Sequence, residues 1–291
     1  MPYDLKGRTV LITGGSRGLG AEIAHHFAAA GCTGIALNYA TREQPAVELA
    51  KKLETDFAGV KAVTIQGDAG VLADCVKCVR ETIEAFGGLD IIIGNAVRLS
   101  SDSTTPHPLP VAEAQAPPKT EQDTLTRDGA QGWTKFSTFG DLDALPEEDW
   151  DKCWAVNVKG QMALLREAMP TFNANPEGGV FIITSSIAGV SLGGSSMPYS
   201  VTKAAQLHLM KCMAQTQGPK VRINAVLPGL LLTDWGNLYP PEAIKNLKER
   251  AVLKDVTDLS DCADAYVMIA RNTSMTGQSV QIDAGLNVAN M

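Results

Sequence analysis

Two side chains that could move a proton, Tyr199 and Lys203, stand four positions apart in a 291-residue chain. The segment around them has a helical pattern, so both side chains share one face. An ammonium group close to a phenol favours the phenolate and lowers its pKa from about 10 toward neutral pH. The pair therefore predicts general acid–base chemistry at Tyr199.

A hydroxyl group, that of Ser186, lies at the end of a predicted strand, thirteen positions before Tyr199. Together the two hydroxyls could bind one carbonyl oxygen and stabilise the alkoxide that develops as hydride arrives. Simpler structural interpretations stay open: Ser186 as a turn residue or helix cap, and Lys203 as a solvated charge.

Glycines crowd a predicted strand-to-helix turn that runs from Leu11 to Gly20. Glycine permits positive φ and lets a pyrophosphate approach bare backbone, while the helix N-terminus offers unpaired N–H groups and positive potential. Such turns also occur as plain structural corners, but the preceding strand and following helix favour a dinucleotide site. The predicted contacts are Thr13, Gly14, Ser16, Arg17, Gly18, Leu19 and Gly20.

The end of the second predicted strand should select the nicotinamide cofactor, because a carboxylate there pairs with the adenosine ribose and repels a 2′-phosphate. No acid stands at this tip, and Arg17 and Arg42 could supply positive charge to a phosphate. NADP(H) is therefore favoured over NAD(H). Alternatively both arginines are ordinary solvated charges, with Glu43 partly offsetting Arg42. The predicted contacts here are Asn38, Tyr39, Ala40, Thr41 and Arg42.

The elements that must position these residues alternate between strand-length apolar runs and helical patterns, which is typical of βαβ units and a parallel sheet. We predict one doubly wound Rossmann-type α/β domain over residues 1–291. Strands are expected at Thr9–Thr13, Gly34–Tyr39, Val60–Gln66, Leu89–Gly94, Gly179–Thr184, Val221–Leu227 and Gln278–Ile282. Helices are expected at Leu19–Ala30, Pro45–Phe57, Leu72–Phe86, Glu147–Thr171, Tyr199–Gln217, Pro241–Arg250 and Ser260–Arg271.

One stretch, residues 98–143, interrupts this alternation with five prolines and few apolar residues. It reads as a long irregular insertion after the fourth strand. Two interpretations stay open: a mobile surface loop, or a flap over a substrate pocket, because ligands of open α/β sheets bind at the carboxyl ends of the strands.

Composition excludes several classes of partner. The net charge is −7, and no dense run of Lys or Arg could follow a nucleic-acid backbone or an anionic membrane. No signal peptide and no membrane span are evident, and six scattered cysteines suit a reducing compartment. We therefore expect a cytoplasmic protein that binds neither nucleic acid nor membrane and holds no metal.

Taken in order, these motifs resemble the short-chain dehydrogenase/reductase family over nearly the whole chain apart from the insertion. The glycine turn resembles its cofactor turn, and Ser186, Tyr199 and Lys203 match its catalytic positions. Asn157 resembles the helix asparagine that holds a water linking the lysine to solvent. Further cofactor contacts implied by the resemblance are Asp68, Ala69, Asn95, Ala96, Pro228, Gly229, Leu231 and Thr233.

The resemblance implies seven parallel strands, a homodimer or homotetramer built on long helices such as Glu147–Thr171, and a lysine that holds the nicotinamide ribose. The end of the second strand is similar to that of NADP(H)-using reductases of polyketide and naphthol metabolism. Two features depart from the family: Val97 stands where glycine is usual and crowds the cofactor's path, and the stretch from Asn95 to Asn157 is unusually long.

Together these features predict a reductase or dehydrogenase that interconverts a small-molecule ketone and a secondary alcohol. The implied catalytic set is Asn157, Ser186, Tyr199 and Lys203. Two other functions stay open on the same residues: a non-redox biosynthetic step with the cofactor retained, and a non-catalytic binding or regulatory protein.

Overall fold

The computed structural model describes residues 3–97 and 145–288. The predicted insertion at 98–143 lies outside these residues, so both interpretations of it stay predictions.

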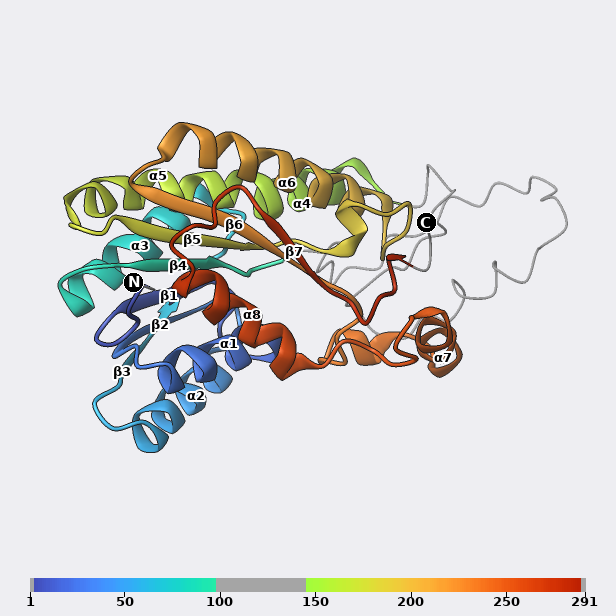
Figure 1. Ribbon diagram of the computed structural model, residues 1–291, viewed down its shortest axis with the longest axis horizontal. Coiled ribbons are helices and arrows are strands. Elements are labelled where there is room, and N and C mark those ends of the chain that lie inside the picture. Colours follow the sequence, from blue (N-terminus) through green and yellow to red (C-terminus); the bar gives the residue numbers. More distant parts are fainter. Residues whose placement is uncertain (1–2, 98–144, 289–291) are drawn as a thin grey trace, which may run out of the picture.

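A parallel sheet lies at the centre of the described chain, with its seven strands in the order β3-β2-β1-β4-β5-β6-β7 (Figure 1). The chain runs outward from β1 to β3, then returns and builds the other half from β4. Between β1 and β4 the strand order reverses, and ligands of such sheets bind at the carboxyl ends beside this point. The strands are β1 Thr9–Ile12, β2 Gly34–Tyr39, β3 Lys61–Gln66, β4 Ile91–Gly94, β5 Gly179–Thr184, β6 Val221–Pro228 and β7 Ser279–Ile282.

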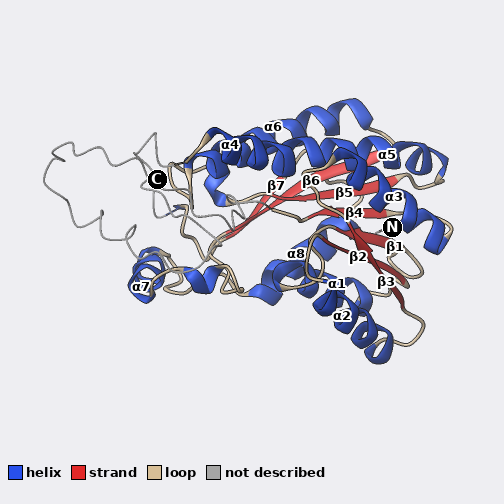
Figure 2. Ribbon diagram, turned by 180° about the vertical axis from the view of Figure 1, so that it is seen from behind, coloured by secondary structure: helices blue, strands red, loops and turns tan. Residues whose placement is uncertain are grey.

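Helices cover both faces of this sheet, which confirms the predicted doubly wound α/β class (Figure 2). One layer holds α1 Gly18–Ala29, α2 Glu43–Asp56 and α8 Leu259–Arg271; the other holds α3 Leu72–Phe86, α4 Glu147–Trp154, α5 Gly160–Ala174 and α6 Met197–Gln217. Helix α7, Pro241–Arg250, stands beyond the carboxyl ends of the strands. None of the helices within the described ranges has the length and apolar character needed to cross a membrane.

Both faces of the central strands are buried, because successive side chains of a strand point to opposite sides. In β1, Val10 and Ile12 join the core under α1 and α8, whereas Leu11 joins the core under α3, α5 and α6. Phe172 of α5 belongs to the second core and packs so closely on β5 that a Cβ at Gly179 would lie 2.3 Å from its ring.

The predicted continuous helix Glu147–Thr171 is interrupted in the structure, which corrects the sequence-based expectation. A π-helical segment, η2 Ala155–Lys159, separates α4 from α5. Such segments disturb the regular helical ladder, are commonly found at functional sites, and leave no periodic signal in the sequence. Here the segment contains Asn157, whose carbonyl oxygen and side-chain amide both bond to side chains of α6.

We expect Phe172→Ala to lower the free energy of unfolding by about 3–5 kcal/mol, because it leaves a cavity between α5 and β5. Urea denaturation monitored by circular dichroism measures this change in the free energy of unfolding. Leu192→Ala is the control, because Leu192 is 99% exposed and truncation there should change stability by less than about 0.5 kcal/mol. Equal losses in the two variants would contradict the described packing.

Candidate active site

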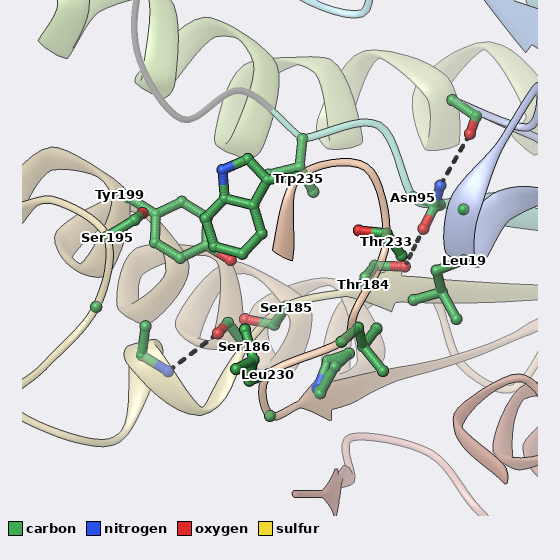
Figure 3. Close-up of a pocket in the computed structure, with 18 of the residues that line it drawn as sticks. Leu19, Asn95, Thr184, Ser185, Ser186, Ser195, Tyr199, Leu230, Thr233 and Trp235 are labelled. Carbon is green, nitrogen blue, oxygen red and sulfur yellow. Dashed lines mark hydrogen bonds between the residues drawn. The ribbon is translucent and has the colours of Figure 1, made fainter. Parts of the chain in front are cut away.

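A cavity of about 890 Å³ opens at the carboxyl ends of the central strands (Figure 3). In Figure 3, Ser195 and Tyr199 are at one end of the view and Leu19 and Asn95 at the other. Most of the residues predicted for cofactor or catalysis line this one cavity: Gly14, Arg17, Gly18, Leu19, Gly20, Ala40, Thr41, Arg42, Asp68, Asn95, Ala96, Ser186, Tyr199, Pro228, Gly229, Leu231 and Thr233.

The other predicted residues do not line the cavity: Thr13, Ser16, Asn38, Tyr39, Ala69, Asn157 and Lys203. Two of these, Thr13 and Asn38, hydrogen-bond to residues that line the cavity. The Thr13 hydroxyl oxygen accepts from the backbone N–H groups of Asn95 and Ala96, each at 2.9 Å. The Asn38 side chain accepts from Gly14 N at 3.2 Å and donates to Gly67 O at 2.9 Å. Asn38 therefore shapes the glycine turn and joins β2 to the loop after β3.

The glycine turn has the geometry that a dinucleotide needs. Gly14 and Gly18 have φ values of +61° and +52°, in the region that favours glycine. At Gly20 a Cβ would lie 2.3 Å from Gly14 O. Helix α1 begins directly after the turn without a side-chain N-cap bond. Its first N–H groups and positive end therefore fit the pyrophosphate of a dinucleotide.

Asn95, at the end of β4, joins the two halves of the sheet beside this turn. Its Nδ2 donates to Thr13 O at 3.0 Å, and its Oδ1 accepts from the Thr184 hydroxyl at 3.2 Å. The same Thr184 hydroxyl lies 2.8 Å from the Tyr266 hydroxyl of α8. One buried amide thus fixes the ends of β1, β4 and β5 relative to one another.

The two arginines predicted to bind a 2′-phosphate converge on a single carboxylate oxygen. Oδ2 of Asp234 lies 3.3 Å from Arg17 Nη1 and 3.7 Å from Arg42 Nη1. Glu43, expected to offset Arg42, acts on the Tyr39 hydroxyl, whose pKa it raises. Sequence reasoning missed Asp234 because it follows β6, far along the chain from both arginines; no local pattern could have found it.

The structure shows the helix-cap role that the sequence left open for Ser186. Its Oγ accepts from Ala188 N at 3.1 Å and so caps the short helix η3, Ile187–Gly189. Its side chain also acts on the Tyr199 hydroxyl, whose pKa it lowers. Capping uses one acceptor position of the Ser186 hydroxyl and leaves its donor position, because a hydroxyl has one donor and two acceptor positions.

The expected acidification of Tyr199 is not what the structure shows. Burial raises the pKa of Tyr199 to about 12, the Ser186 side chain opposes this rise, and Cys153 adds to it. Lys203 Nζ lies 5.6 Å from the centre of the Tyr199 ring. Its own pKa falls to about 7 through burial, only partly offset by Cys153. Desolvation of the two groups therefore outweighs the attraction that their spacing suggested.

Lys203 is fully buried, so its interpretation as a solvated charge is wrong. Its Nζ donates to Thr184 O at 2.6 Å and to Gln206 Oε1 at 3.3 Å. Gln206 Nε2 donates to Asn157 O at 2.8 Å. Sequence reasoning missed Gln206, although a polar residue three positions after Lys203 shares its helix face.

Apolar and aromatic side chains form another part of the cavity lining. Leu230, Leu238 and Trp235 belong to it, and the Trp235 and Tyr239 rings meet edge to face with centroids 5.2 Å apart. Val97 also lines the cavity, where the sequence placed it. Within residues 3–97 and 145–288, no group of three His, Cys, Asp or Glu side chains is arranged to hold a metal ion.

Ser195 lines the cavity with a buried hydroxyl that has no hydrogen-bond partner in the described part of the protein. It stands four residues before Tyr199, beside it in Figure 3. Leaving such a group unpaired costs about 1–3 kcal/mol, so a polar group of a ligand would bind favourably there.

Comparison with known proteins matches two family models to successive parts of the chain. Residues 8–114 match the family described as short chain dehydrogenase, and residues 130–287 match the one described as Enoyl-(Acyl carrier protein) reductase. A short-chain dehydrogenase/reductase of Pestalotiopsis microspora is 30% identical over 98% of this chain and 97% of its own length.

Two further relatives carry names or ligands of interest. A Streptomyces violaceoruber protein named as a ketoacyl reductase of granaticin polyketide synthase is 28% identical, over 96% of this chain and 95% of its own. A short-chain dehydrogenase of Burkholderia cenocepacia, solved with NADP, has a TM-score of 0.77 and 26% identity over 99% of this chain and all of its own. With its sheet order, glycine turn and cavity, this chain is therefore an oxidoreductase of the short-chain dehydrogenase/reductase family.

Proposed function

We propose that this protein is an NADP(H)-dependent ketoreductase that reduces a ketone to a secondary alcohol. The observation that carries the proposal is that two hydroxyl side chains, Ser186 and Tyr199, line the same cavity as the glycine turn. Both hydroxyls can donate to one oxygen atom, which is what a carbonyl oxygen requires as it gains negative charge.

The bound nicotinamide would supply the hydride. Tyr199 donates the proton to the carbonyl oxygen, while Ser186 donates a hydrogen bond to the same atom. With a pKa of about 12, Tyr199 holds its proton at neutral pH, which supports the reductive direction. Lys203, behind the tyrosine ring, supplies positive charge to this end of the cavity when it is protonated, and we propose that it also holds the nicotinamide ribose.

For the cofactor, the convergence of Arg17 and Arg42 supports NADP(H) over NAD(H). Two guanidinium groups directed at one anionic oxygen suit a phosphate, which carries more charge than a carboxylate. The Asp234 carboxylate would then compete with the 2′-phosphate for both arginines. The NADP complex of the Burkholderia cenocepacia relative supports the same preference.

The proposed substrate class rests on the apolar part of the cavity lining. Trp235, Leu230 and Leu238 favour a mid-sized ketone with apolar or aromatic surface. The unpartnered Ser195 hydroxyl supports one additional polar group on that substrate, near the reacting carbonyl.

We also propose a cytoplasmic homodimer or homotetramer assembled through α4, α5 and α6. Trp154 of α4 and Val201 of α6 keep 39% and 44% of their surface exposed on this layer. All six cysteines are free, which supports a reducing compartment.

We expect Tyr199→Phe to lower kcat for ketone reduction by about 100- to 10,000-fold, because the proton donor is lost. NADPH absorbance against a panel of ketones measures the rate. Tyr3→Phe is the matched control: the buried Tyr3 hydroxyl has no partner in the described residues and lies outside the cavity, so kcat should stay unchanged. An unaltered rate in Tyr199→Phe would overturn the assignment.

We expect Arg17→Ala and Arg42→Ala each to raise the KM for NADPH by about 10- to 100-fold, because each removes a charge-assisted bond to phosphate. The KM for NADH should change little. Asp234→Asn should instead lower the KM for NADPH, since it removes the competing carboxylate. Steady-state kinetics with both cofactors test this. Equal losses with NADPH and NADH, or wild-type preference for NADH, would contradict the proposed phosphate site.

We expect Val201→Glu to reduce the mass of the assembly measured by light scattering, because it places a charge on the proposed α4–α6 face. Val252→Glu is the control at a comparably exposed valine outside these helices. A monomeric wild type would contradict the proposed assembly.

A further inference from the structure

We propose that Gln206 is a positioning residue of this site. Its carboxamide holds the Lys203 ammonium beneath the end of β5 and connects it to the π-helical segment at Asn157. The proposal deepens the proposed function, because Lys203 is the group through which Gln206 acts.

Lys203, Gln206 and Asn157 are joined by direct hydrogen bonds between protein atoms. Gln206 Oε1 accepts from Lys203 Nζ at 3.3 Å, and Gln206 Nε2 donates to Asn157 O at 2.8 Å. Asn157 is in turn held by its own side chain, whose Nδ2 donates to Thr202 Oγ1 at 3.0 Å. All four side chains are fully buried.

The two bonds determine the orientation of the carboxamide. If the amide were flipped, its NH₂ group would face the Lys203 ammonium and its oxygen would face the Asn157 carbonyl, so both contacts would become repulsive. A buried polar side chain costs free energy unless it is hydrogen-bonded. Gln206 offsets that cost by forming one hydrogen bond with Lys203 and one with Asn157.

The oxygen of Gln206 matters most for the charge of Lys203. A buried ammonium needs acceptors to remain charged, and within residues 3–97 and 145–288 the oxygens that accept from it are Thr184 O and Gln206 Oε1. Gln206 therefore stabilises the charged form against the desolvation that lowers the pKa of Lys203. A carboxamide has no titrating proton near neutral pH, so these bonds set geometry and charge but carry no proton.

Few other ionisable groups face Lys203 from the elements packed around it. Tyr199 lies on the same helix, and Cys153 of α4 acts on the pKa values of both residues. Helix α4, which packs on α6, also has the buried carboxyl group of Asp149, one helical turn before Cys153. Tyr266 of α8 reaches the Thr184 side chain. In the described chain, three other elements pack on α6. The short helix η3 has no ionisable side chain, and the only one in η2 is that of Lys159, which is exposed. Strand β6 has Arg222, whose guanidinium donates to Ala270 O of α8.

The test compares two substitutions of similar size. Gln206→Met removes the acceptor, so the ammonium is less stable and the pKa of Lys203 should fall by about one pH unit, equivalent to a tenfold change in proton affinity. Gln206→Glu places a carboxylate beside the ammonium, so the pKa should rise by at least as much. NMR titration of the full-length protein with ¹³C-labelled lysine measures both values, with the Lys203 signal identified by its loss in Lys203→Met.

The pH dependence of activity provides a second measurement. If Lys203 must be charged, kcat/KM for ketone reduction falls as pH rises through its pKa. This alkaline fall should move to lower pH in Gln206→Met and to higher pH in Gln206→Glu. A merely structural glutamine would lower activity equally at every pH, without moving the fall.

Gln161→Met is the matched control. Gln161 is an equally buried glutamine on α5 that packs on Gly94 of β4. Its substitution should change unfolding in urea without shifting the Lys203 titration. Unchanged titration in both Gln206 variants, or shifts in the same direction, would overturn the proposal. If Gln206→Met does not fold, Gln206→Glu decides it alone, since an absent upward shift contradicts the proposed contact.

The NMR experiment separates this inference from the proposed function, because it needs neither substrate nor cofactor. Opposite shifts in a protein that reduces no ketone would support the role of Gln206 and contradict the ketoreductase. An unchanged Lys203 titration in an enzyme that reduces ketones would contradict the role of Gln206 and support the ketoreductase.

Discussion

A single buried ammonium group imposes the main constraint on this site. Lys203 is fully buried, and in the described part of the chain its ammonium donates to oxygen atoms of Thr184 and Gln206, which stabilise its charge. Thr184 ends β5, and Gln206 is held by Asn157 in the π-helical segment. The strand end, the helix α6 and the interruption of α4–α5 must therefore keep their relative positions for the lysine to remain charged.

The same part of the sheet also builds the cofactor side. Thr184 donates its hydroxyl proton to Asn95, and Asn95 bonds to the backbone of the glycine turn. The chain of contacts thus runs from the turn after β1, through β4 and β5, to the lysine on α6. Such a connection explains how two halves of the sheet, far apart in sequence, place a dinucleotide-binding turn and a tyrosine in one cavity.

Burial changes how the tyrosine and lysine work as a pair. In water an ammonium group near a phenol would favour the phenolate, but here each group pays a desolvation cost that disfavours its charge. The result is a protonated tyrosine at neutral pH beside a lysine poised near its own pKa of about 7. That state is suited to giving a proton to a carbonyl oxygen, and it makes the acceptors of Lys203 important for the pH range in which the site works.

The regular elements were predictable because their periodicity is local. The predicted β2, β5, α3 and α7 have the bounds seen in the structure, and the other strands differ by at most two residues at either end. The glycine turn, Ser186, Tyr199 and Lys203 were visible as spaced residue types. The break at Asn157 was not, because a π-helical segment keeps the helical composition of its neighbours.

By itself the sequence determined the α/β alternation, the positions of the glycines and the placement of a phenol and an amine on one helix face, since each depends on neighbours along the chain. Only the tertiary structure decided that burial outweighs their mutual attraction, that Asp234 sits between Arg17 and Arg42, and that Gln206 joins Lys203 to Asn157. The physical reason is that desolvation and these contacts depend on which distant segments fold against one another, and no local pattern encodes that.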